Sequence, residues 1–228
     1  HIRGQALSES SFWMLGDRVR ARSAPHCNMI FVALAEGFAR AVAPERLNFV
    51  DVGAHLGDCC LWAAARWGKR VNCLAVEGNP LNAGAIRSSI EGSKIAGVVD
   101  VEHKMVLSSL EGGDCLFVPA GSTTLSCILT RISGVADLVN LYLGGLATED
   151  LEEFAVLREA LPALQRRVDL APRAILVRTT RTDPTIFASL VSQHRLPYRV
   201  IVLREPYDTL LVLKNSTWDA LFTFPSSA

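Results

Sequence analysis

The run Phe49-Val50-Asp51-Val52-Gly53-Ala54-His55-Leu56-Gly57-Asp58 decides the fold class of this chain. Its first part is short and mostly apolar, as in a buried strand, and Gly53 and Gly57 follow. Glycine lets the backbone adopt angles that a side chain would forbid, and it lets a ligand approach the main chain closely. A helix starting after this turn would add unpaired N–H groups. The run therefore predicts a strand-turn-helix unit with a ligand site at its turn.

Strands and helices alternate on both sides of this run. We expect helices over residues 29–40, 60–67, 81–90 and 151–167, strands over 47–52, 71–76, 98–106, 116–118, 137–143, 174–178, 199–203 and 210–213, and a loop over 121–124. Such alternation predicts a Rossmann-like α/β fold, with a doubly wound, mostly parallel sheet and right-handed crossovers. No linker or repeat interrupts the pattern, so we expect one domain over residues 1–228, with residues 1–25 as a lead-in segment.

An acidic residue, Glu77, follows the second expected strand. It lies 20 residues after Gly57, close to the spacing typical of a carboxylate that binds the ribose of a nucleotide-like ligand. A carboxylate can accept hydrogen bonds from both hydroxyls of a vicinal diol, which explains the residue type. The structural alternative is that Glu77 caps the following helix, where its charge would favour the helix dipole.

Several common motifs are missing from the chain. The glycine spacing is not G-x-G-x-x-G, which counts against NAD, and no G-x-x-x-x-G-K-[ST] occurs for a P-loop nucleotide. Serine and histidine do not occur in a nucleophile-elbow context, so hydrolysis by a catalytic triad has no support. The turn, the acid and the βαβ context together favour S-adenosylmethionine as the ligand.

The same residues resemble the FkbM-type methyltransferases. The resemblance is specific over residues 49–83, including the run Val76-Glu77-Gly78-Asn79-Pro80-Leu81-Asn82-Ala83. It continues more diffusely from residue 30 to residue 205, through the stretches 106–109, 153–160 and 174–177. The resemblance implies a class I methyltransferase fold with S-adenosylmethionine as the methyl donor.

Carried over residue by residue, the resemblance implies a cofactor site at the ends of the first three strands. Asp51, Gly53 and Gly57 would border the methionine portion. Glu77 would bind the ribose, and Asn79 would help to shape the adenosine side. The end of the third strand is where adenine packs. The full set of expected cofactor-binding residues is Asp51, Gly53, Ala54, His55, Gly57, Glu77, Gly78, Asn79, Met105 and Val106.

The chain departs from the family in two places. The family commonly has asparagine where this chain has His55. The family's lysine-isoleucine-aspartate-valine-glutamate-glycine signature falls on Asn140-Leu141-Tyr142-Leu143-Gly144-Gly145, where the lysine and both acids are missing. The resemblance therefore leaves the catalytic base and the acceptor-facing part of the site unassigned.

Composition narrows the class of partner and the compartment. The formal net charge is zero, whereas a nucleic-acid-binding protein usually has a basic surplus. The six cysteines form no C-x-x-C pair, so we expect no metal site. We expect buried reduced thiols in a soluble protein, which favours the cytoplasm, while the even number of cysteines leaves disulfides possible. No apolar run is long enough to span a membrane.

The sequence leaves three functions open. The first is methyl transfer from S-adenosylmethionine to an oxygen or nitrogen of a small-molecule or glycan acceptor. The second is a non-catalytic module that binds the cofactor with a degenerate acceptor site, as the stretch from Asn140 to Gly145 suggests. The third is a nucleotide-dependent oxidoreductase, against which the glycine spacing argues.

Overall fold

The computed structural model describes residues 27, 29–41, 46–91, 93, 95–108, 115, 119–143, 152–165, 167, 170–179, 183, 185–204 and 208–214. They belong to two compact units, His1–Met105 and Val106–Ala228. The expected lead-in over residues 1–25 and the short strand at 116–118 lie outside the described residues. The single domain over residues 1–228 stays a prediction.

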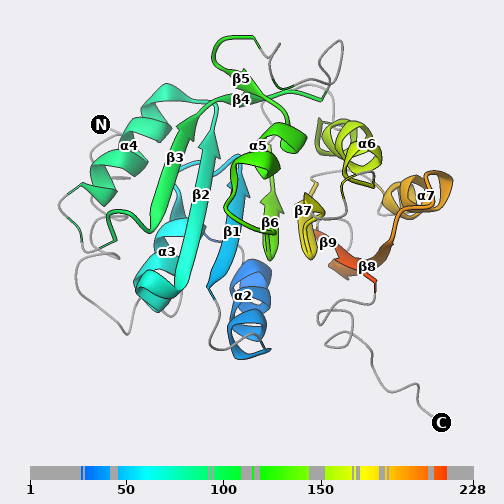
Figure 1. Cartoon of the computed structure of the whole chain (residues 1–228), viewed down its shortest axis with the longest axis horizontal. Helices are drawn as coiled ribbons and strands as arrows, with labels where there is room; N and C mark the ends of the chain where they lie inside the picture. Colours follow the sequence, from blue (N-terminus) through cyan, green and yellow to red (C-terminus); the bar gives the residue numbers. More distant parts are fainter. Residues whose placement is uncertain are drawn as a thin grey trace. The chain divides into compact units, whose positions relative to one another are not determined.

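The first unit contains three parallel strands in the order β3-β2-β1 (Figure 1). The strands are β1 (Leu47–Val52), β2 (Val71–Glu77) and β3 (Val99–His103). The helices are α2 (Met29–Ala41), α3 (Asp58–Trp67) and α4 (Pro80–Ile90), and the 3-10 turn η2 (Gly68–Arg70) follows α3. The expected βαβαβ alternation is therefore confirmed.

Aromatic side chains hold α2 and α3 against the first strand. The ring of Phe49 on β1 lies 5.7 Å from that of Phe31 on α2 and 5.8 Å from that of Trp67 on α3, both edge to face. Trp62 lies 5.0 Å from Trp67 and 6.4 Å from Phe31. Edge-to-face pairs stabilise a core beyond the area that they bury. This cluster fixes α3, and with it the turn that precedes α3.

The second unit contains β6 (Leu138–Leu141), β7 (Ala174–Arg178), β8 (Tyr198–Arg204) and β9 (Asp208–Leu213). Its helices are α5 (Leu125–Arg131), α6 (Glu152–Gln165) and α7 (Thr185–Gln193). Strands β6 and β7 are parallel, and β9 is antiparallel to both β7 and β8. Across the sheet the strand order is β3-β2-β1-β6-β7-β9-β8, so the expected fold class is confirmed. No helix in the described part of the chain is long and apolar enough to cross a membrane.

The expected third strand, over residues 98–106, is in fact two strands. Strand β3 ends at His103, and β4 (Met105–Val106) pairs with β5 (Ser122–Thr123) in a separate two-stranded sheet. Alternation of apolar and polar residues continues through the break, because that pattern is the same whichever strand supplies the hydrogen bonds. The pattern alone therefore gave one strand that is too long.

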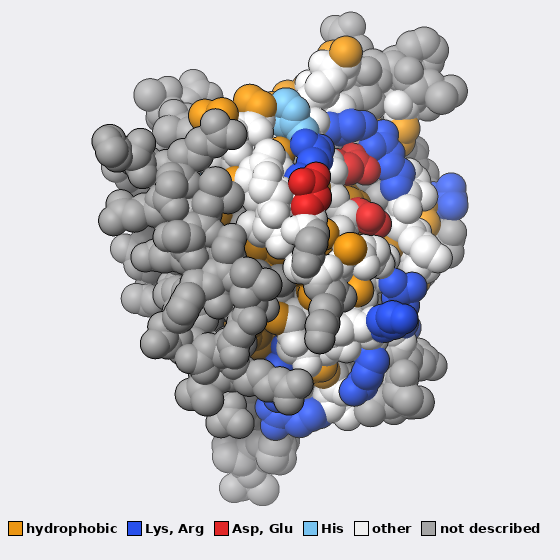
Figure 2. Space-filling model, turned by 90° about the vertical axis from the view of Figure 1, so that its left-hand side faces the viewer, with side chains coloured by type: hydrophobic (Ala, Val, Ile, Leu, Met, Phe, Trp, Pro, Cys, Tyr) orange, Lys and Arg blue, Asp and Glu red, His pale blue; other side chains and the backbone are white. Residues whose placement is uncertain are grey.

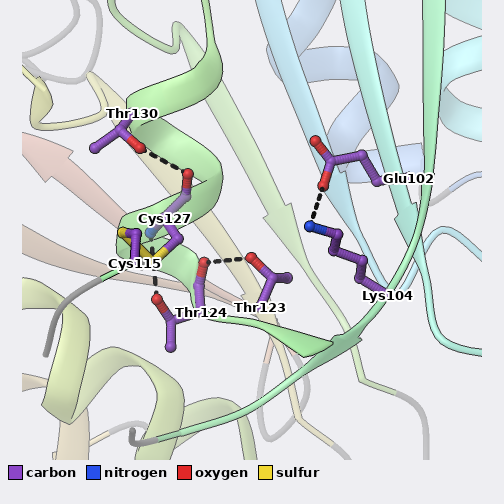
Figure 3. Close-up of a disulfide and its surroundings, with 7 residues drawn as sticks. All are labelled: Glu102, Lys104, Cys115, Thr123, Thr124, Cys127 and Thr130. Carbon is purple, nitrogen blue, oxygen red and sulfur yellow. Dashed lines mark hydrogen bonds and ion pairs between the residues drawn. A yellow bond between two sulfur atoms is a disulfide. The ribbon is translucent and has the colours of Figure 1, made fainter. Parts of the chain in front are cut away.

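The expected loop over residues 121–124 is also wrong. It contains β5, and Thr124 is the N-cap of a helix that sequence reasoning missed, α5. The Thr124 hydroxyl oxygen accepts a hydrogen bond from the backbone N–H of Cys127, 3.2 Å away (Figure 3). A disulfide joins Cys127 to Cys115. A threonine that caps a helix looks like a loop residue in sequence, because both roles favour the same residue types.

The expectation of buried reduced thiols is wrong for four of the six cysteines. Disulfides join Cys27 to Cys59 and Cys115 to Cys127, and only Cys60 and Cys73 are free and buried. Cys59 lies in the first turn of α3, and Cys27 comes 32 residues earlier in the chain. The fold brings these two cysteines together, and spacing along the sequence does not reveal such a contact.

Replacing both Cys27 and Cys59 by alanine should lower the free energy of unfolding by about 2–4 kcal/mol, because the disulfide restricts the unfolded chain. Urea denaturation without reductant measures this loss. In excess reductant the parent and the variant should differ by much less, since both then lack the bond. Equal stability without reductant would contradict the pairing.

Candidate functional site

The turn after β1 has a left-handed backbone at three positions. Gly53 and Gly57 both have φ of 76°, and His55 has φ of 52°. The backbone N–H groups of Gly53 and Ala54 donate to the carbonyl oxygen of Val76, at 2.9 and 3.1 Å. The turn is therefore attached to the end of β2. Histidine and asparagine both occur more often than most residues in this backbone region, so His55 suits the position where the family has asparagine.

The carboxylate of Glu77 joins the two turns that follow β1 and β2. One oxygen, Oε2, accepts from the backbone N–H of His55 at 2.7 Å, and Oε1 accepts from that of Asn79 at 2.8 Å. The residue is only 8% exposed. Each carboxylate oxygen can accept two hydrogen bonds, so each keeps capacity for one more donor. Gly53 and Glu77 thus end adjacent strands at the same edge of the parallel sheet, as expected.

Asn79, and not Glu77, supplies the side-chain cap of α4. The Asn79 Oδ1 accepts from the backbone N–H of Leu81 at 2.9 Å, and Pro80 occupies the first helical position. Asparagine at the N-cap and proline at N1 form a favourable helix start. Glu77 instead accepts from the backbone N–H of Asn79, the N-cap residue itself, so its charge also lies at the start of α4 and the structural alternative stays open.

Two exposed apolar side chains belong to segments next to Glu77, the start of α4 and the chain around Lys104, whose backbone N–H donates to the Glu77 carbonyl oxygen. Leu81 is 64% exposed and Met105 is 55% exposed, while Val106 is partly buried. A Cβ added to Gly78 would lie 3.2 Å from the Met105 sulfur, so Met105 packs directly against this glycine. Sequence reasoning included Met105 and Val106 but missed Leu81. The sequence signal that could have identified Leu81 is an apolar residue in the first turn of an expected helix.

Asp51 lies in the interior of the unit. It is 3% exposed on β1, and its charge is one cause of the raised pKa of the buried Cys60 thiol. The main causes of that raised pKa are a hydrogen bond with Cys73 and burial. The raised pKa keeps the Cys60 thiol protonated near neutral pH, and Asp51 is a buried acidic residue on the strand that leads into the glycine turn.

Packing, as well as backbone conformation, requires glycine at position 57. A Cβ on Gly57 would lie 3.0 Å from both Cγ1 and Cγ2 of Ile86 on α4. The left-handed backbone at this position is a second obstacle to any other residue. Gly57 thus lets the start of α3 pack closely against α4.

The second unit contains the stretch where the family has its lysine and acids. Asn140 is buried on β6, and Tyr142 is partly buried just after the strand. The carboxylate of Glu153 on α6 accepts from the backbone N–H of Leu143 at 2.9 Å. Sequence reasoning missed this carboxylate because the first turn of a helix is an ordinary place for an acid. Gly144 and Gly145 lie outside the described residues.

Neither a protein-family model nor a curated protein sequence matches this chain. Solved structures share its fold. Precorrin-6y C5,15-methyltransferase from Geobacter metallireducens has a TM-score of 0.50 and 17% identity, over 82% of this chain and 88% of that chain. The human methyltransferase 10 domain containing protein has a TM-score of 0.54 and 14% sequence identity, and the match covers 87% of this chain and 83% of that chain. The N-terminal domain of human METTL16, in complex with SAH, has a TM-score of 0.55 and 11% sequence identity, and the match covers 86% of this chain and 71% of that chain.

The chain has the class I methyltransferase fold. At these identities the likeness shows the fold, and the FkbM-type family stays a prediction. The ten expected cofactor-binding residues also stay predictions, although the structure brings the two glycines of the turn, Glu77 and Asn79 to one edge of the parallel sheet.

Replacing Gly57 by alanine should lower the free energy of unfolding by about 1–3 kcal/mol, because a Cβ there is strained and overpacks Ile86. Gly84→Ala on α4 is the matched control. A Cβ at Gly84 meets nothing within 4 Å, so this variant should gain about 0.5–1 kcal/mol from its higher helix propensity. Thermal or urea denaturation checks both, and a Gly57→Ala variant as stable as the parent would contradict the packing argument.

Proposed function

We propose that the chain is an S-adenosylmethionine-dependent methyltransferase that transfers a methyl group to an oxygen or nitrogen of an acceptor. The observation that carries the proposal is the Glu77 carboxylate. It joins the turns after β1 and β2, and each of its oxygens keeps capacity for one hydroxyl. The fold, which the chain shares with solved methyltransferases, supports this assignment.

S-adenosylmethionine suits the residues that surround Glu77. A vicinal ribose diol matches the two remaining acceptor positions of the carboxylate. The exposed apolar side chains of Leu81 and Met105 offer a surface for the flat adenine ring. Gly53 has no side chain, so the turn presents no side chain at this position to block the methionine portion. Sugar, base and amino acid thus each have a matching group in the first unit.

The reaction needs alignment more than proton transfer. When bound, S-adenosylmethionine supplies a methyl group on a positively charged sulfur, which is already activated for in-line displacement. Glu77 orients the sugar, and the turn after β1 fixes the backbone around the amino acid portion. Holding two reactants in line is a large source of rate by itself. A base is required only where the acceptor must lose its proton early, and we assign none.

One observation favours a second candidate function, a non-catalytic cofactor-binding module. The lysine and both acids of the family signature are missing at the stretch from Asn140 to Gly145. Binding of S-adenosylmethionine without methyl transfer to any acceptor tested would support this module. An FkbM-type enzyme, in contrast, should methylate a small-molecule or glycan hydroxyl or amine.

Charge and redox state constrain the acceptor and the compartment. The formal net charge is zero, which suits a small-molecule or glycan acceptor better than a nucleic acid. Figure 2 shows acidic side chains beside basic ones in the upper part of the face it draws, and further basic side chains lower on the same face. The two disulfides favour an oxidising compartment over the cytoplasm that reduced thiols would favour.

Replacing Glu77 by glutamine should weaken S-adenosylmethionine binding about tenfold or more, as measured by calorimetry. The amide has one acceptor oxygen instead of two, and hydrogen bonds to a charged group contribute about 1.5–3 kcal/mol each. Circular dichroism should show a folded variant with a lower melting temperature, because the amide cannot accept from the N–H groups of both His55 and Asn79.

The matched control is Glu91→Gln, at the C-terminal end of α4, which should leave the affinity unchanged. A parallel titration with NAD should show no binding. Parent-like affinity for S-adenosylmethionine in a folded Glu77→Gln variant would remove the ribose assignment. Binding of NAD in place of S-adenosylmethionine would favour the oxidoreductase.

A further inference from the structure

Two oppositely charged residues share one register position in the second unit. Asp208, at the start of β9, is opposite Arg178 on β7. In an antiparallel sheet, directly opposite residues are close neighbours, so these two side chains meet at one end of the strands.

The guanidinium of Arg178 is held on two sides. Its Nε donates to the Oδ1 of Asp208 at 3.2 Å, and its Cζ lies 5.7 Å from the ring centroid of Tyr142. The Asp208 side chain is fully buried, whereas that of Arg178 is 32% exposed. Among the described residues, no other group bonds to the two terminal amino groups of Arg178. These groups form the edge of the fork that binds carboxylates and phosphates through two parallel bonds.

The place of this cluster in the sheet is where ligands bind in this class of fold. Tyr142 follows the last residue of β6, and Arg178 is the last residue of β7. Both thus lie at the carboxyl ends of parallel strands, and open α/β sheets bind their ligands at this edge. Asp208 reaches the same edge because β9 is antiparallel to β7.

The other end of β7 has a similar ion pair that lacks these features. Arg173 precedes the strand and donates through Nη1 to the Oδ1 of Asp137 at 2.7 Å. The exposed fractions match those of the first pair, 33% for Arg173 and 4% for Asp137. However, Arg173 bonds through a terminal amino group and lies at the amino end of the strand. It is therefore an internal reference for a purely structural arginine-aspartate pair.

We propose that Arg178, held by Asp208 and Tyr142, binds an oxyanion of the ligand, either a carboxylate or a phosphate group. Asp208 and Tyr142 are positioning residues, since they act through the guanidinium. The ligand of this site in the second unit would then be an anionic molecule that carries a carboxylate or a phosphate group.

The test is an NMR titration of the full chain with inorganic phosphate and, separately, with acetate, at constant ionic strength. The parent chain should show saturable shifts of the Arg178 side-chain signal with at least one of the two anions, and the stronger binder identifies the source of the oxyanion. Arg178→Gln should weaken that binding about tenfold or more, followed through the Tyr142 signals, because it removes both charge and fork. Arg173→Gln, which breaks the reference pair, should leave it unchanged.

Arg178→Lys keeps the positive charge and an ion-pair partner for Asp208 but removes the forked guanidinium. This variant therefore tests the proposal if Arg178→Gln does not fold. It should bind the anion more weakly than the parent because an ammonium cannot form two parallel bonds. No saturable binding of either anion, or equal losses in Arg173→Gln and Arg178→Gln, would overturn the proposal. Since neither titration contains S-adenosylmethionine, failure of the methyltransferase assignment would show separately, in the cofactor calorimetry.

Discussion

The bridge that the Glu77 carboxylate forms between two turns is the constraint on which the site depends. The backbone N–H groups of His55 and Asn79 belong to different strand ends, and a single buried side chain accepts from both. Burying a charge is costly unless hydrogen bonds compensate it, and here two backbone donors do so. The bridge fixes the spacing of the two turns before any ligand arrives. Such preorganisation lowers the entropy that binding must lose.

The surrounding sequence serves this bridge. Left-handed angles at Gly53 and Gly57 return the chain sharply enough for His55 to meet the carboxylate. The cap that Asn79 provides for α4 fixes the second donor. The aromatic cluster around Phe49 and Trp67 holds α3, so that the glycine turn is anchored at both ends. Residues that look unrelated in sequence therefore share one structural task.

Much of the fold was predictable because local pattern and tertiary structure agree there. The strand over residues 47–52 and the strand over 174–178 are buried apolar runs with clear ends, and the structure has both with the predicted bounds. The partners of Met105 and Val106 were not predictable, because a strand's own pattern does not say which strand it pairs with. Helices α5 and α7 were missed, as both are short. In the candidate cofactor site, the spacing between the glycines and Glu77 was visible in the sequence. Arg178 offered no such signal, because its partner Asp208 lies 30 residues away along the chain.

The disulfide between Cys27 and Cys59 makes a closed covalent ring of the intervening chain. Helix α2, strand β1 and the glycine turn all lie inside this ring. A pulling force applied through the chain on either side passes across the sulfur atoms and does not load β1. A single protease cut within residues 28–58 leaves both fragments attached, so the ends of the broken strand stay at a high effective concentration. The part of the chain that contains the glycine turn is thus shielded from extension and stays attached after a single cut, because of one covalent bond.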